Sequence, residues 1–119
     1  MARVGFMDTL VECFRPTGQK ELDLVAASGY TQWPPRLPDQ DIFYPVTNEA
    51  YAIALTQWNI TDFGAGYVTR FWVKKSFMDR YPIQKVGGAS ATEWWIPAAD
   101  LEEFNKNIVG KIEVIGEYR

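Results

Sequence analysis

The segment 66–74 constrains the fold of this chain more than any other stretch. Large side chains alternate along it, with Tyr67, Phe71 and Val73 on one face and Val68 and Trp72 on the other. Bulky residues on both faces predict a central β-strand whose sheet is covered on both sides. The rest of the chain must therefore supply strands on both sides of it.

The first of these partners is predicted before residue 30. Apolar residues alternate over 9–15, which predicts a strand that Pro16 ends, because proline removes a ladder donor. Thr17 can then cap a helix over 18–28, and Gly29 fits the left-handed position that follows a helix.

A second strand and helix are predicted over 41–58. The strand 41–46 is cut by Pro45, and either Thr47 or Asn48 can cap a helix that runs to about Trp58.

A proline-rich loop connects the two units, from Tyr30 to Gln40. Because it is stiff and carries Trp33 and Arg36, it can form the wall of a binding site. The alternative is a loop that folds over the core and is anchored by Trp33 and Leu37, and the sequence leaves both open.

The last third begins with a small-residue loop and a strand over 92–96. Pro97 is placed to open a helix over 98–107, Gly110 to end it, and alternation over 111–118 predicts a terminal strand. The order of elements predicts a single α+β domain over 1–119, with a mixed or mostly antiparallel sheet and about three helices. The first eight residues carry little pattern, and we expect them to fray.

Composition excludes several classes of function. The net charge is −3 without a basic stripe, which argues against nucleic-acid binding, and no apolar run approaches the roughly 20 residues of a membrane span. The single cysteine, Cys13, cannot form an internal disulfide, so we expect a reduced, cytoplasmic setting. The chain has no histidine, which removes histidine-based nucleophile systems and most zinc sites, and we expect no metal.

Glu93 is the first candidate for chemistry. In a strand over 92–96 it shares a face with Trp95, and a carboxylate beside an indole is partly desolvated. The glycine pair at 87–88 lets a backbone approach a ligand closely. The alternative is a solvated strand residue that follows an ordinary turn.

Arg15 and two tyrosines are the other candidates. Arg15 ends a strand just before a helix, where a guanidinium can bind a phosphate or form a surface ion pair. Tyr44 and Tyr51 flank a strand–helix corner and can enclose a flat ring, although Tyr51 can equally pack in the core.

Three segments together carry a family resemblance: 14–18, 42–52 and 93–98, with support from 104–105 and 108–110. The chain resembles a family of small bacterial proteins labelled "ADP-ribosylation/crystallin". Its layout is similar to a minimal ADP-ribosyltransferase fold, which the resemblance therefore implies.

The resemblance also implies roles for five residues. Arg15 would hold the phosphates or ribose of NAD, Tyr44 and Tyr51 would stack on nicotinamide, and Glu93 would be the catalytic glutamate. Thr92 matches the remnant of a Ser-Thr-Ser element beside that glutamate.

Two functions follow as expectations. The first is an NAD-binding, ADP-ribosyltransferase-like domain that transfers ADP-ribose to an unknown acceptor, such as a protein. The second is a non-catalytic module of the same fold, which binds a nucleotide, another ligand or a protein through the Trp33 loop and the Trp94–Trp95 region.

Overall fold

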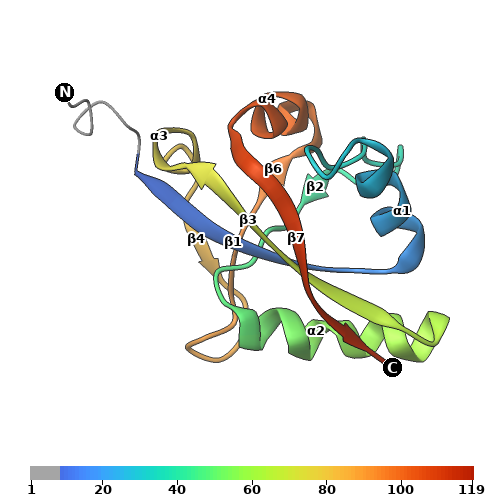
Figure 1. The fold of residues 1–119 in the computed structure, drawn as a ribbon. Coiled ribbons are helices and arrows are strands. Elements are labelled where there is room, and N and C mark those ends of the chain that lie inside the picture. The colour runs from blue at the N-terminus through green and yellow to red at the C-terminus, as the bar shows by residue number, and fades with distance from the viewer. Residues whose placement is uncertain (1–8) are drawn as a thin grey trace.

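The computed structural model describes residues 9–119 as an α+β domain (Figure 1). The expected fraying of residues 1–8 lies outside the described residues. In chain order the elements are β1 (Leu10–Thr17), α1 (Gln19–Ala27), β2 (Ile42–Phe43), α2 (Glu49–Phe63), β3 (Gly66–Lys74), α3 (Lys75–Met78), β4 (Ile83–Lys85), β5 (Thr92–Trp94), β6 (Ile96–Pro97), the 3-10 turn η2 (Ala98–Asp100), α4 (Leu101–Lys106) and β7 (Ile108–Tyr118). The described part thus has four α-helices where about three were expected, and the shortest is the single turn α3.

Strand β3 is central, as its two bulky faces predicted. It pairs antiparallel with β1 on one side and with β7 on the other. Single bridges from Phe14 to Val46 and from Val46 to Glu93 join the β4–β5 hairpin to the same sheet. All of these pairings are antiparallel, which is one of the two alternatives predicted for the sheet.

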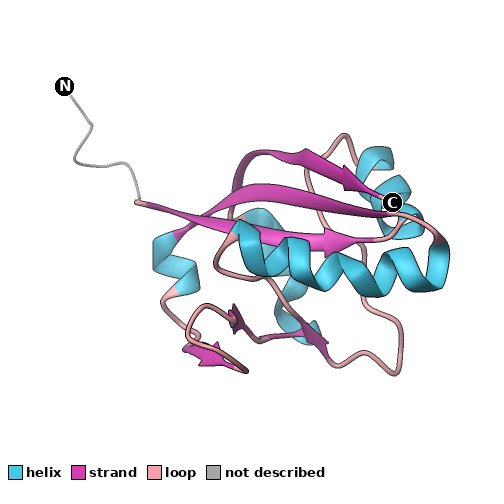
Figure 2. Cartoon of the chain, turned by 90° about the horizontal axis from the view of Figure 1, so that it is seen from below, coloured by secondary structure: helices cyan, strands magenta, loops and turns pink. Residues whose placement is uncertain are grey.

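Helices cover both faces of the sheet, as the central strand requires. Helix α2 lies along one face, and α1 and α4 lie on the other (Figures 1 and 2). On the α2 face, Phe14, Val46, Ala52 and Val68 form a small buried cluster. The opposite face holds the larger core, which includes Cys13, Trp33, Phe43, Phe71 and Phe104.

The prediction that Pro16 ends the first strand is wrong, because β1 continues to Thr17. The N–H and C=O of Phe14 both bond to Val46, so they point away from β3. Since backbone groups two residues apart point to the same side, the missing N–H of Pro16 also faces away from β3 and costs no bond to that strand.

Helix ends differ from the sequence prediction in two places. Gly18, not Thr17, is the N-cap of α1, because Thr17 is still in β1. Asn48 does cap α2, where its side chain accepts from the N–H of Tyr51, but the helix runs past Trp58 to Phe63. It ends at Gly64, whose φ of 84° is the left-handed conformation that glycine adopts without strain.

The C-terminal third is more broken than predicted. The strand expected over 92–96 divides at Trp95 into β5 and β6, and a 3-10 turn precedes the short α4. Gly110 does not end that helix: it lies within β7, at a φ of 81°. No helix of the described residues has the length and apolar character to cross a membrane.

Trp33 fixes the proline-rich loop to the core. Its side chain is 1% exposed and packs against the rings of Phe43 and Phe71, with centroids 5.6 and 5.2 Å away. Removal of a buried aromatic ring of this kind typically costs about 3–5 kcal/mol. Leu37, the other expected anchor, is 61% exposed and anchors nothing. The loop is therefore held at its start and lies over the surface beyond it.

Candidate functional site

Glu93 lies on the α2 face of the sheet and is 9% exposed, so it is not the solvated strand residue of the alternative interpretation. Its carboxylate accepts one hydrogen bond from the hydroxyl of Tyr51, at 3.1 Å, and another from Nε1 of Trp95, at 2.7 Å. Burial, and then the adjacent Glu93 charge, raise the pKa of Tyr51 above its usual value. Each carboxylate oxygen therefore already has a donor from the protein.

Thr92 contributes to the same region from the other side of the strand. Its hydroxyl contacts the hydroxyl of Thr47, and the side-chain amide of Asn48 donates to the carbonyl of Ser90 at 2.7 Å. These contacts hold the glycine-containing loop before β5 against the N-terminus of α2. The hydroxyl of Thr92 is therefore engaged in holding this loop against α2.

Arg15 is engaged elsewhere. Its guanidinium donates to both carboxylate oxygens of Glu21, at 3.0 and 3.1 Å, and to the carbonyl of Tyr44 at 3.3 Å. It also stacks on the ring of Phe43, 4.6 Å from the centroid. The side chain of Arg15 is only 12% exposed, so this paired arrangement is largely built into the core. Tyr44 meets Arg15 through its backbone, while its own side chain is exposed.

Arg15 and Glu93, the two charged residues that the resemblance assigned to an NAD site, lie on opposite faces of the sheet. Side chains of residues directly opposite on neighbouring strands point to the same face, and successive side chains alternate. The bridges Phe14–Val46 and Val46–Glu93 thus put Glu93 on the face of Phe14, beside α2. Arg15 follows Phe14 and points to the other face. The structure therefore does not bring the Arg15 guanidinium and the Glu93 carboxylate into one cleft.

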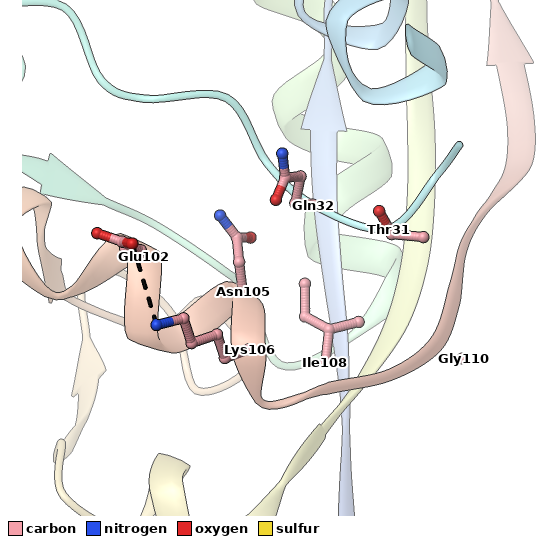
Figure 3. A pocket seen from close by; sticks show the side chains of 7 residues that line it. All are labelled: Thr31, Gln32, Glu102, Asn105, Lys106, Ile108 and Gly110. Atoms are coloured by element: carbon pink, nitrogen blue, oxygen red, sulfur yellow. Dashed lines mark ion pairs between the residues drawn. The ribbon is translucent and has the colours of Figure 1, made fainter. Parts of the chain in front are cut away.

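A groove that the sequence prediction did not assemble lies between the Trp33 loop and α4. One cavity, of about 400 Å³, is lined from the loop and from α4 and the start of β7, as Figure 3 shows. A second, of about 490 Å³, continues past Trp33 and Arg36 to η2. The two share Gln32, Glu102 and Asn105, so we treat them as one groove.

Asn105 sets the width of this groove. Its side-chain carbonyl accepts from the backbone N–H of Trp33, and its amide donates to the backbone carbonyl of Trp33, both at 2.9 Å. The pair joins the loop and α4 across 72 positions of sequence. The proline-rich loop thus lines one wall of this groove, and no local sequence signal indicated that α4 lines the other.

Arg36 gives the groove its main charge at the loop end. Its guanidinium lies 5.8 Å from the ring centroid of Phe43, and burial and the nearby Arg15 lower its pKa. In the described part of the chain no acidic side chain forms an ion pair with it.

Metal binding has no support in residues 9–119, where no group of three or more His, Cys, Asp or Glu side chains is placed to hold an ion. No protein-family model, no curated protein and no solved structure matches the chain. The family resemblance therefore stays a prediction.

Proposed function

We propose that this protein is a non-catalytic ligand-binding module, and that its ligand occupies the groove between the Trp33 loop and α4. The observation that carries the proposal is the pair of adjoining cavities whose walls Asn105 joins. Cavities of this size are typical of small-molecule sites, which are concave, partly apolar and largely preformed. We propose this function for the cytoplasm, where the buried Cys13 stays a thiol.

The engagement of the charged candidates elsewhere supports a binding role over a catalytic one. The two donors on Glu93 and the bidentate pair of Arg15 with Glu21 both come from the protein. A substrate would have to displace these partners, and each such hydrogen bond to a charged group contributes about 1.5–3 kcal/mol. The groove needs no comparable rearrangement.

A matched pair of bulky substitutions tests the location. Ala99 is exposed and lines the second cavity, and Ala54 is exposed on α2, on the opposite face of the sheet. In a fragment screen by NMR, we expect hits to shift groove resonances in the wild type, to bind Ala99→Trp at least tenfold more weakly, and to bind Ala54→Trp normally. Hits that bind Ala99→Trp as well as the wild type would place the ligand site elsewhere.

ADP-ribosyl transfer is a second candidate, together with the transferase-like fold that the resemblance implies. One observation favours it: Tyr51, the expected aromatic residue, contacts the expected glutamate, Glu93. In this hypothesis NAD is the substrate and an unknown protein the acceptor. We expect Glu93→Ala to abolish NAD hydrolysis or transfer with the fold intact, and a wild-type rate that survives this substitution would contradict the hypothesis. Calorimetry that detects no binding of NAD or ADP-ribose at millimolar concentration would favour the first proposal.

A further inference from the structure

Two residues that line the second cavity each carry a buried hydrogen-bond donor without a partner in the part of the chain that the structure describes. Among residues 9–119, three buried side-chain polar atoms have no hydrogen-bond partner, and two of them are Nε1 of Trp33 and Nε of Arg36. Both residues line the second cavity. Buried donors without acceptors are rare and costly in folded proteins. The terminal nitrogens of the Arg36 guanidinium are not buried in this way and have no hydrogen-bond partner among the described residues, so they can donate to an acceptor in the cavity.

The charge at this end of the groove favours a negative acceptor. Arg15 and Arg36 both lie over the ring of Phe43, but Arg15 is neutralised by its bidentate contact with Glu21. Arg36 forms no ion pair in the described part of the chain, so its guanidinium is the unpaired positive charge of this cavity.

One acidic residue, Glu102, lines the same cavity and opposes this field. Its side chain is 87% exposed and lies 4.0 Å from Lys106. Solvent and the lysine therefore screen its charge, whereas the donors of Trp33 and Arg36 are buried.

We propose that the groove binds a small organic ligand through an oxyanion, a carboxylate or a phosphate, held by the guanidinium of Arg36 with the indole N–H of Trp33 close by. The planar guanidinium presents paired donors that match either oxyanion. Beyond it, Pro35, Ala98 and Leu101 offer an apolar wall for the rest of the molecule. This inference rests on the proposed binding function and specifies its ligand class.

Three probes of similar size test the charge requirement: phenyl phosphate, benzoate and the neutral benzamide. Titration of ¹⁵N-labelled protein is followed at the indole N–H of Trp33 and the side-chain amide of Asn105. We expect at least one of the two anions to bind at least tenfold more tightly than benzamide and to weaken in 0.5 M salt. The tighter anion identifies the preferred group. Equal affinities for all three probes would overturn the oxyanion proposal while leaving the groove as a binding site, and no response at either signal would overturn both.

Substitution of the arginine gives an independent result. We expect Arg36→Gln to remove the preference for the anions, and Arg36→Lys, which keeps the charge without the planar fork, to retain part of it. Arg80 is the matched control, because it also lies over a ring, that of Phe77, but is paired with Glu103. Arg80→Gln should keep the full preference. An undiminished preference in Arg36→Gln would contradict the proposal. The comparison of probes on the wild type remains decisive even if this variant does not fold.

Discussion

Replacement of Asn105 by alanine should destabilise the protein and loosen one wall of the groove. The side chain makes two hydrogen bonds of 2.9 Å to the backbone of Trp33, whose residue is 1% exposed. Without Asn105, the N–H and C=O of Trp33 lose their partners in a position where water has little access.

The expected cost follows from those two bonds. Each contributes about 1 kcal/mol net, and a buried group left unpaired adds to this, which gives about 2–3 kcal/mol in total. Asn105 lies within α4, and the better helix propensity of alanine offsets about 0.5 kcal/mol. We therefore expect the free energy of unfolding to fall by about 2 kcal/mol in Asn105→Ala.

Urea unfolding followed by tryptophan fluorescence measures this difference. Asn107→Ala is the control, because Asn107 makes one exposed bond of 2.9 Å, to the carbonyl of Glu103, and should cost less than about 0.5 kcal/mol. If Asn105→Ala loses no more stability than this control, the two bonds do not hold the loop against α4, and the structural basis of the groove is wrong.

Three further outcomes follow from the contacts. Arg15→Met should lower the free energy of unfolding in urea by about 2 kcal/mol, because it leaves the half-buried Glu21 carboxylate unpaired. Addition of Glu21→Gln to this variant should recover part of the loss, and a double variant no more stable than Arg15→Met would contradict this. Gly64→Ala should cost about 1 kcal/mol, since its φ of 84° strains any side chain, and an unchanged midpoint would refute that strain. Burial and the bond to Asp100 raise the pKa of Tyr81 to about 12, so folding favours the protonated phenol. The stability that this phenol contributes is present below pH 10 and is lost as the pH rises toward 12, so the free energy of unfolding of Tyr81→Phe should fall less steeply over that range than that of the wild type. Equal slopes for the two proteins would exclude Tyr81 as the origin of the loss.

Local sequence signals predicted the elements whose causes are local. The alternation along 66–74 correctly indicated a central strand, because the bulky side chains on each of its two faces must be buried in a core of their own. Gly29 was predicted to follow a helix and has a φ of 78° after α1, and of the two predicted caps for α2, Thr47 and Asn48, the structure has Asn48. The end of a helix depends on hydrogen bonds between residues only a few positions apart, so the local sequence can predict it.

Errors arose where distant pairing decided the conformation. Pro16 is accommodated in β1 only because its nitrogen faces away from β3, which depends on the register with that strand. Gly110 fits the end of a helix as well as a turn within a strand, and the pairing of β7 with β3 decides between them. The register of β1 or β7 with β3 cannot be read from the residues next to Pro16 or Gly110.

The candidate site shows the same division. Tyr51 and Glu93 meet through their side chains, whereas Arg15 reaches Tyr44 only at its backbone carbonyl. Whether Arg15 and Glu93 face each other depends on the bridges through Val46, which place their side chains on opposite faces of the sheet. The groove depends on contacts between Trp33 and Asn105, which no spacing in the sequence connects.

The most direct test of the central claim is a titration of ¹⁵N-labelled protein with phenyl phosphate and, in parallel, with benzoate. The account predicts saturable shifts concentrated at Gln32, Trp33, Arg36 and Asn105, on the α4 side of the sheet. Shifts concentrated at Tyr51 and Glu93 on the α2 side, or no saturable shift at all, would contradict it.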